Sequence, residues 1–258
     1  MRERILKAFC AGSVAAIVVT TALARAESLE IESSDTRVML VELYTSEGCS
    51  SCPPADRWLS SLTQDDQLWR QFVPVAFHVD YWNYIGWPDR FASPAYSERQ
   101  RQNARRNHMR SVYTPGFFLN GEEWRSWFSQ PNLPAPGGDK VGNLTLTVQQ
   151  TMLDASFAPH GEVTGDLILN VALLGFDLTS DVKAGENRNR RLRHDFAVLG
   201  YQRGTMNKRE KGYRLRMRLP MNNVDDAQGS RSAIAAWVTD AENDAPIQAA
   251  GGWLVTQQ

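Results

Sequence analysis

The sequence predicts an α/β domain over residues 36–129, followed by an all-β, sandwich-like domain over residues 143–258. Strand-like and helix-like runs alternate in the first region, which is typical of an α/β fold. Residues 130–142 contain three Pro and three Gly and indicate a linker. After them, short strand-like runs follow one another between turn-rich stretches, and no strong helix is expected among them.

The first region begins with a predicted strand, Val38–Tyr44, which is an apolar run with β-branched residues, bounded by a turn at Ser46–Gly48. A helix is expected next. Pro53 and Pro54 suit a first helical turn, where the missing N–H has no partner to lose, and apolar residues then recur at helical spacing from Trp58 to Leu62.

Two more strands and a second helix complete this region. The run Phe72–Tyr81 indicates a second buried strand. Ser93 is suited to be an N-cap followed by proline, and Ala95–Asn107 predicts a polar, Arg-rich helix. Val112–Asn120 contains a third strand, and Asn120 with Gly121 predicts a hairpin turn.

The second region holds six short runs that are alternating or apolar, as expected for a sandwich. These predicted strands are Leu144–Val148, Val163–Leu174, Phe196–Tyr201, Tyr213–Leu219, Ser232–Thr239 and Ala249–Val255.

Residues 1–26 are predicted to be a secretory signal peptide. Basic residues precede an almost uncharged, mostly apolar run at Ala8–Ala22, and Ala24–Ala26 fits the small-x-small pattern of a cleavage site. The alternative is a retained membrane anchor, but the apolar run is shorter than the roughly 20 residues that span a bilayer. We therefore expect a periplasmic or secreted protein without a membrane span after signal removal.

The charge balance argues against nucleic acid as a partner. Lys and Arg number 28, Asp and Glu number 29, and the net charge is −1. A nearly neutral chain offers no general attraction to phosphate backbones.

The cysteines allow one intramolecular disulfide in the mature chain. Cys10 lies within the predicted signal, which leaves Cys49 and Cys52, and export places these two where disulfides form and persist. The pair stands between a buried strand and a helix start, where the helix dipole and free N–H groups favour a thiolate. We expect Cys49 to be the attacking thiolate and Cys52, one turn further on, to be the resolving thiol.

The alternative for this pair is a structural disulfide. In the chain-entropy model a four-residue loop contributes about 2 kcal/mol, against roughly 3 kcal/mol for fifteen residues. Because distant cysteines would stabilise the fold more, the spacing favours redox or other thiol-dependent chemistry.

The order of a strand VMLVELY, a turn, CSSC, a helix and a second strand resembles the opening of the thioredoxin superfamily. That resemblance implies a thioredoxin-like fold for the first region and a cis-proline opposite the Cys pair. The run Tyr113-Thr114-Pro115 before a strand fits this landmark. It implies that Pro115 is cis and that the Thr114 backbone pairs with an extended substrate, the alternative being an ordinary trans proline before an edge strand.

A closer resemblance covers residues from Glu42 to Leu199. The runs ELYTSEGCSSCPPAD, FHVDYWNYIGWPDRFASPAYSERQ, VYTP and GENRNRRLRHDFAVL resemble a secreted bacterial family known as domain of unknown function 1223. The family implies a thioredoxin-like domain joined to a β-rich domain, and no proven activity. The Ser-Ser spacer between the cysteines differs from those of thioredoxin and of strong oxidases, so no reduction potential is transferred.

Glu42 is a carboxylate inside an apolar strand, seven residues before Cys49. Thioredoxins often carry a buried acid near this place that relays a proton to the second cysteine, and burial would raise its pKa for that role. The resemblance thus implies a proton relay from Glu42 to Cys52. The alternatives are that Glu42 faces water or pairs with an arginine.

His78 and Asp80 lie on one face of a strand end, and Trp82 and other aromatic residues follow. We expect this loop to form a wall beside Cys49 and to contact a protein substrate, since Tyr and Trp are enriched at such surfaces. A satisfied structural His–Asp pair is the alternative. Thiolates and an imidazole would also suit copper or zinc, but the spacing gives no closed ligand set, and no metal or other cofactor is predicted.

Two arginine-rich runs have open roles. One lies on the predicted helix Ala95–Asn107, and the other, Arg188–Arg193, precedes His194 and Asp195. Such runs are usually solvated faces. The match of the second run to the family also allows a contact between the domains or with a partner.

These features favour a periplasmic or secreted thiol–disulfide oxidoreductase that acts on protein thiols or disulfides. The alternative from a different class is a non-catalytic envelope binding module on a thioredoxin-like scaffold. Its β-rich region would bind the ligand, and its Cys pair would be a stable disulfide. A third interpretation is a metal carrier, for copper.

Overall fold

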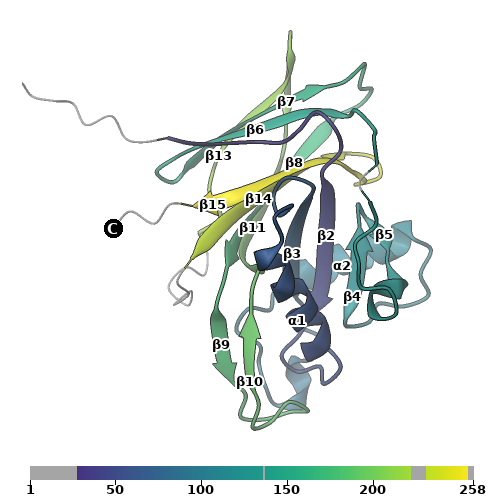
Figure 1. Cartoon of the computed structure of the whole chain (residues 1–258), viewed down its shortest axis with the longest axis vertical. Helices are drawn as coiled ribbons and strands as arrows, with labels where there is room; N and C mark the ends of the chain where they lie inside the picture. The colour runs from purple at the N-terminus through teal and green to yellow at the C-terminus, as the bar shows by residue number, and fades with distance from the viewer. Residues whose placement is uncertain (1–27, 136, 222–230, 255–258) are drawn as a thin grey trace, which may run out of the picture.

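A computed structural model describes residues 28–135, 137–221 and 231–254 of the 258-residue chain (Figure 1). The predicted signal peptide, residues 1–26, lies outside the described residues. Among the helices of the described part, none is long and apolar enough to cross a membrane.

The strands of the described part form a mixed sheet, an antiparallel sheet and a small hairpin (Figure 1). The mixed sheet has eight strands in the order β15 (Pro246–Leu254), β14 (Ser232–Asp240), β8 (Leu167–Gly175), β11 (Ala197–Thr205), β3 (Phe72–His78), β2 (Met39–Thr45), β4 (Gly116–Leu119) and β5 (Glu122–Glu123). The antiparallel sheet has five strands in the order β1 (Leu29–Glu32), β6 (Gly142–Gln149), β7 (Met152–Pro159), β13 (Gly212–Arg218) and β12 (Asn207–Arg209).

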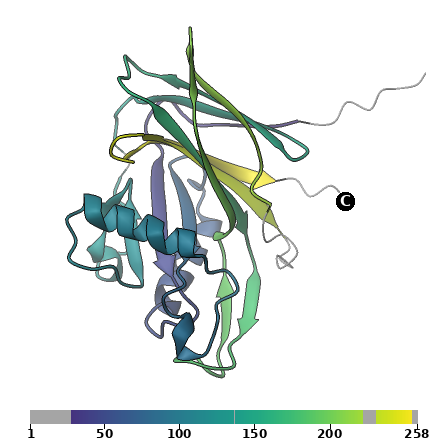
Figure 2. The same cartoon turned by 180° about the vertical axis from the view of Figure 1, so that it is seen from behind.

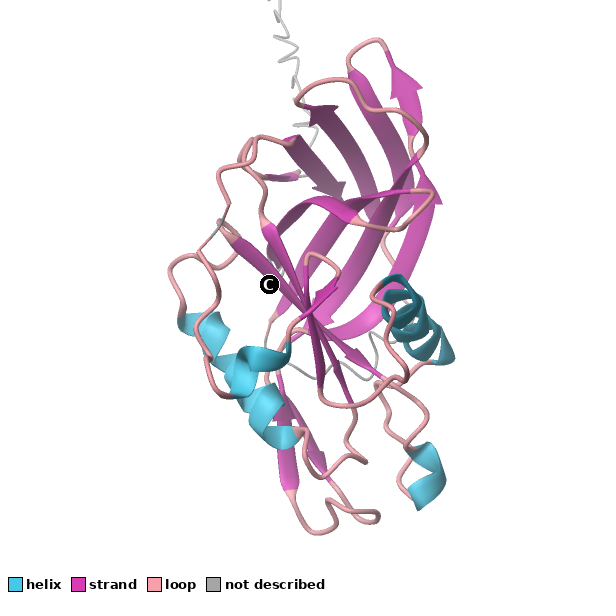
Figure 3. Ribbon diagram, turned by 90° about the vertical axis from the view of Figure 1, so that its right-hand side faces the viewer, coloured by secondary structure: helices cyan, strands magenta, loops and turns pink. Residues whose placement is uncertain are grey.

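Two α-helices, α1 (Pro53–Ser61) and α2 (Pro94–Arg106), lie on opposite sides of the mixed sheet (Figures 2 and 3). β2 runs parallel to β3, and α1 belongs to the crossover that parallel neighbours require. The hairpin of β9 (Leu178–Asp181) and β10 (Arg191–His194) extends below the mixed sheet beside α1 (Figure 1). The short 3-10 helices are η1 (Leu62–Gln64), η2 (Asn83–Ile85) and η3 (Arg125–Phe128).

The elements predicted for the first region are present, and β2, α1, β3 and α2 begin within a residue of their expected positions. The Ser93 hydroxyl accepts a hydrogen bond from Ala95 N, as an N-cap does. Asn120 and Gly121 have φ angles of 48° and 81°, the left-handed values that a two-residue hairpin turn requires. β3 ends at His78, earlier than expected, because Asp80 N donates to the Ser97 hydroxyl of α2 and not to a strand.

The mixed sheet crosses the predicted domain boundary. β8, β11, β14 and β15 come from the second region, yet they continue the sheet that β2 and β3 begin. The junction is the parallel pairing of β11 with β3, where Ala76 N donates to Phe196 O at 2.9 Å. The predicted limits at 36–129 and 143–258 therefore do not coincide with the sheets. An alternation of apolar and polar residues indicates a strand, but it does not specify which other strand will pair with it.

One hydrophobic core spans both regions. Trp237 of β14 is fully buried and stacks on Tyr201 of β11, with ring centroids 5.9 Å apart. Arg99 of α2 is also buried and lies over the Trp237 ring, 4.9 Å from its centroid. Of the first arginine run, Arg99 therefore joins the two regions, whereas Arg105 on the same helix is exposed.

Candidate active site at the Cys49–Cys52 disulfide

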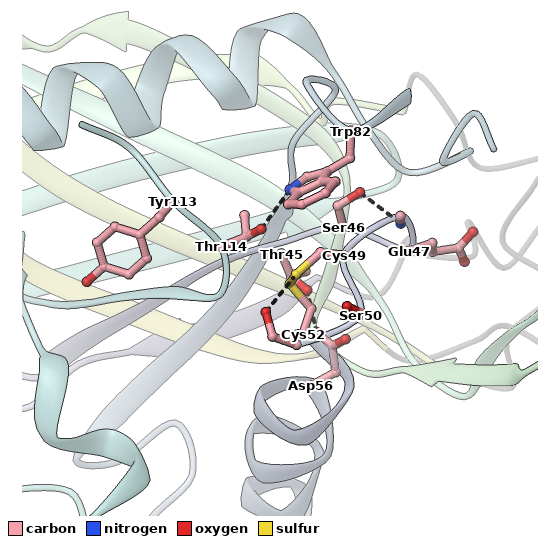
Figure 4. The surroundings of a disulfide bond; sticks show 12 residues. Thr45, Ser46, Glu47, Cys49, Ser50, Cys52, Asp56, Trp82, Tyr113 and Thr114 are labelled. Atoms are coloured by element: carbon pink, nitrogen blue, oxygen red, sulfur yellow. Dashed lines mark hydrogen bonds between the residues drawn. A yellow bond between two sulfur atoms is a disulfide. The ribbon is translucent and has the colours of Figure 1, made fainter. Parts of the chain in front are cut away.

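Cys49 and Cys52 form a disulfide between the end of β2 and the start of α1, with their Cα atoms 5.4 Å apart (Figure 4). Cys52 is the N-cap of α1, and Pro53 is its first residue. Ser46 shapes the preceding turn, because its hydroxyl accepts a hydrogen bond from Gly48 N and its carbonyl accepts one from Cys49 N, both at 3.1 Å. Both cysteines are fully buried in this oxidised state.

Thr114 and Trp82 lie beside the disulfide (Figure 4). The Thr114–Pro115 peptide bond is cis, as the thioredoxin resemblance implies. Trp82 Nε1 donates to Thr114 Oγ1 at 2.8 Å. A Cβ atom at Gly48 would lie 2.9 Å from Trp82 Cβ, so only glycine at this position lets the tryptophan pack against the Cys loop. Trp82 is thus one part of the expected aromatic wall that reaches the disulfide loop, and Trp87, whose Nε1 donates to Glu47 Oε2 at 2.7 Å, is another.

His78 and Asp80 have separate partners. His78 has no exposed surface, and its Nδ1 is 2.7 Å from Asp89 Oδ2. Asp80 accepts a hydrogen bond from the Ser97 hydroxyl of α2. Because its ring is enclosed, His78 cannot touch a protein substrate in this conformation. Its side chain instead belongs to the interior of the site.

Glu42 is paired with an arginine, one of the alternatives that the sequence leaves open. Its Oε1 accepts from Arg99 Nε at 2.8 Å, and Asn103 Nδ2 donates to its Oε2 at 3.3 Å. Both partners belong to α2. Successive strand residues point to opposite faces, so Glu42 points toward α2 while Thr45, three residues on, points toward α1 and Asp56. The structure therefore gives Glu42 no contact with Cys52.

Asp56 is a buried acid of α1 on the disulfide side of the sheet, and the sequence did not predict it. It lies one helical turn after Cys52, its side chain stands beside Cys52 in Figure 4, and its Oδ1 accepts from Thr45 Oγ1 at 2.8 Å. Burial raises the pKa of Asp56 more than the nearby imidazoles of His78 and His194 lower it. The i,i+4 spacing from Cys52 is the signal that could have revealed it.

A buried cluster of acids and imidazoles extends from the disulfide loop. Asp89 Oδ2 accepts from Glu47 N at 2.8 Å in addition to contacting His78. His194 of β10 places its Nε2 3.2 Å from Glu47 Oε1. The rings of His78 and His194 pack edge to face, with centroids 4.8 Å apart.

Charge pairing sets the protonation of this cluster. Burial raises the pKa of Asp89, but the charge and hydrogen bond of His78, together with the hydrogen bond from Glu47 N and the charge of His194, leave it below its ordinary value. Burial lowers the pKa of His78, but the charge and hydrogen bond of Asp89, together with the charges of Asp56 and Glu47, leave it above its ordinary value. The structure therefore favours a charged Asp89–His78 pair.

The loop between β9 and β10, residues 182–190, brings the second region to the disulfide. Asn187 is fully buried, and its Nδ2 donates to Glu47 O at 2.8 Å and to Cys49 O at 2.9 Å. Glu186 Oε2 accepts from Ser50 N at 3.1 Å. These residues fall within the run GENRNRRLRH that the family resemblance includes, and the sequence offered no other signal for them.

Metal binding has no support from the geometry of the described residues. Within residues 28–135, 137–221 and 231–254, no group of three or more His, Cys, Asp or Glu side chains is arranged to hold a metal ion.

Comparison with known proteins gives a family and two similar structures. The family model described as "Protein of unknown function (DUF1223)" matches residues 40–239, most of the chain. A crystal structure of an Agrobacterium tumefaciens protein, a structural genomics target, is 26% identical, with a TM-score of 0.60 over 86% of this chain and 97% of that one. HBP35 of Porphyromonas gingivalis is 14% identical, with a TM-score of 0.55 over 88% of this chain and 80% of that one, so this likeness concerns the fold alone. No curated protein matches the chain.

Proposed function

The chain belongs to the DUF1223 family, and we propose that it is a periplasmic or secreted thiol–disulfide oxidoreductase that acts on protein thiols or disulfides. The observation that carries the proposal is the Cys49–Cys52 disulfide at the N-terminus of α1, with Thr114, the residue before the cis-bonded Pro115, alongside. The same arrangement supports a thioredoxin-like assignment for the first region. The predicted signal peptide supports export.

The reaction is an exchange of disulfides. A partner thiolate attacks Cys49 Sγ, a new sulfur–sulfur bond forms, and the Cys49–Cys52 bond breaks with its electron pair on Cys52. A second partner thiolate then attacks the partner's sulfur in this mixed disulfide, and Cys49 leaves as a thiolate, which the N-terminus of α1 stabilises. The partner is oxidised by two electrons and the Cys pair is reduced. The reverse sequence reduces a partner disulfide.

Asp56 is suited to handle the proton on Cys52 in this scheme. When Cys52 leaves as a thiolate, a protonated Asp56 donates its proton to that sulfur. In the reverse direction, the Asp56 carboxylate accepts the proton before Cys52 attacks. Its burial and its position one turn after Cys52 support this role. We thus propose Asp56, in place of Glu42, for the proton relay that the thioredoxin resemblance implies.

Access to Cys49 needs a local opening. Neither cysteine has exposed surface, so a partner reaches the sulfur only when the side chains over it move. Thr114 and Trp82 are half-buried at the edge of the disulfide and form the approach that we propose for an extended substrate.

The burial of both cysteines favours a second candidate function. A disulfide enclosed in this way could be purely structural, in a non-catalytic binding module of the cell envelope. A reduction potential between roughly −270 and −120 mV would place the couple among working oxidoreductases, whereas a value below about −300 mV would fit a structural disulfide.

Two serine variants test the proposal and are matched to each other. Cys49→Ser and Cys52→Ser remove the same disulfide and each leave one thiol. We expect Cys52→Ser to accumulate a mixed disulfide with a disulfide-containing model protein, Cys49→Ser to trap none, and both to lose turnover. The oxidoreductase proposal is wrong if the wild-type protein shows no exchange and neither variant traps the model protein.

A further inference from the structure

The second region supplies a loop that holds the backbone around Cys49. Asn187 donates from a single amide nitrogen to the carbonyls of Glu47 and Cys49, so it spans the turn that precedes the disulfide. Two residues of this turn are therefore fixed by a side chain more than 130 positions away in the sequence, since the separations are 140 and 138 residues.

The orientation of the Asn187 amide is itself fixed. Arg190 Nη1 donates to Asn187 Oδ1 at 2.9 Å, which leaves the amide nitrogen to face the Cys loop. On the other side, Gly185 has a φ of 74°, and a Cβ there would lie 3.0 Å from Ile85 Cδ1. The loop 182–190 thus rests against η2 as well as against the Cys loop.

Glu186 places a carboxylate at the start of the disulfide motif. Its Oε2 accepts from the peptide N–H of Ser50, the residue that directly follows Cys49. The hydrogen bonds with Ser50 lower the pKa of Glu186, so the side chain is charged at neutral pH. Backbone N–H groups at this helix start are those that would stabilise a Cys49 thiolate.

The other titratable groups near Cys49 come from several elements. Glu47 lies in the same turn and Asp56 on α1. His78 of β3 and His194 of β10 oppose these carboxylates within the buried cluster. Asp89, which accepts from Glu47 N, belongs to the same cluster. Among these six groups, Glu186 is the exposed one, so its charge can be removed without opening the core.

We propose that Asn187 and Glu186 are positioning residues of the Cys pair. Asn187 holds the Cys49 turn, and Glu186 disfavours the Cys49 thiolate. Glu186 thereby keeps the reduction potential of the Cys49–Cys52 couple below the value that the N-terminus of α1 alone would give. The inference rests on the proposed oxidoreductase function and gives the second region a part in it. A carboxylate near the thiolate destabilises the reduced form relative to the disulfide, and this lowers the reduction potential.

Glu186→Gln tests the inference, with Glu162→Gln as its control. Glu162 is an exposed carboxylate of the second region without a contact to the Cys loop, so the control removes the same charge elsewhere. Two quantities are measured on full-length mature protein. One is the Cys49 thiol pKa, from the ultraviolet absorbance of the thiolate after reduction with a phosphine. The other is the equilibrium with glutathione.

We expect Glu186→Gln to lower the thiol pKa and to shift the glutathione equilibrium about threefold toward reduced protein, a rise of about 14 mV at 29.6 mV per tenfold. Added salt should diminish the difference. Glu162→Gln should match the wild type. In an Asn187→Ala background, Glu186→Gln should have a smaller effect, because the carboxylate is then no longer held at Ser50.

The outcomes separate this inference from the proposed function. Equal thiol pKa values and equilibria for Glu186→Gln and Glu162→Gln overturn the inference, even in a protein that exchanges disulfides. A shifted thiol pKa in a protein that exchanges with no model substrate supports the positioning role and overturns the oxidoreductase proposal. If Asn187→Ala fails to fold, the comparison of Glu186→Gln with Glu162→Gln still decides whether Glu186 influences the Cys49 thiolate.

Discussion

Replacement of Arg99 by methionine should destabilise the protein by about 3–5 kcal/mol, because it leaves the Glu42 carboxylate buried without its cation. Arg99 donates to Glu42 Oε1 from Nε at 2.8 Å and approaches it with Nη2 at 2.7 Å. The two side chains are 3% and 0% exposed, so water cannot replace the lost partner. The remaining partners of Glu42, Tyr44 and Asn103, are neutral donors.

The double variant Glu42→Leu/Arg99→Met removes both charges and should recover most of that loss. Asp244, which lies 3.8 Å from Arg99, retains Arg203 at 2.8 Å in either variant. The free energy of unfolding is measured by urea titration, with tryptophan fluorescence and far-ultraviolet circular dichroism followed together. Because Arg99 also lies over Trp237 of the second region, both signals should shift to the same midpoint.

Additive effects would refute this reasoning. If the two single replacements sum to the double within about 0.5 kcal/mol, Glu42 and Arg99 do not act as a pair. A Glu42→Gln variant adds a functional check. If it slows disulfide exchange while the urea midpoint is unchanged, the relay expected from the sequence would stand and the structural pairing would not explain Glu42.

Three further predictions concern the site. Asp56→Asn should slow disulfide exchange by about 100-fold at neutral pH in a stopped-flow assay. The urea midpoint should not fall, because burial already disfavours the ionised Asp56 carboxylate. An unchanged exchange rate would contradict the proton-transfer role of Asp56. The Asp89–His78 pair should contribute most to the free energy of unfolding between about pH 4 and pH 6.5. The contribution of Asp89 is lost as the pH falls through its lowered pKa, and that of His78 is lost as the pH rises through its raised pKa. Asp89→Asn should therefore flatten both limbs of Tm plotted against pH, and a profile parallel to the wild type would count against the pairing. Trp82→Phe removes the hydrogen bond to Thr114, which contributes about 0.5–1.5 kcal/mol to stability. The variant should raise KM for a peptide substrate with little change in kcat. A fall in kcat alone would contradict a substrate-contact role for Trp82.

The parts of the site that the sequence predicted depend on local signals. Pro53 follows Cys52 at the start of a helix because its ring suits the first turn, and Ser93 caps α2 through its own side chain. The turn at Asn120 and Gly121 follows from two residues that accept positive φ. Each of these signals lies within a few residues of the feature that it predicts.

The parts that the sequence did not predict depend on pairing between distant segments. Arg99 meets Glu42 across 57 positions, and Asn187 meets Cys49 across 138. The strands β9 and β10 have four residues each and expose every second one, which leaves little hydrophobic pattern to detect. The expected domain boundary fails to separate the sheets for the same reason, since the edge of β3 that accepts β11 has no signature in either strand.

The placement of the second region changes what the Cys pair can do. In a chain that ended near residue 129, β3 would have an open edge in place of β11, and the Cys49 turn would lack Asn187. Glu47 would lose its imidazole partner, His194. The second region therefore does not merely follow the Cys-containing region along the chain. It completes the sheet beneath the disulfide, closes the buried cluster beside it, and contributes a carboxylate at Ser50, so the chemistry that we propose belongs to the two regions together.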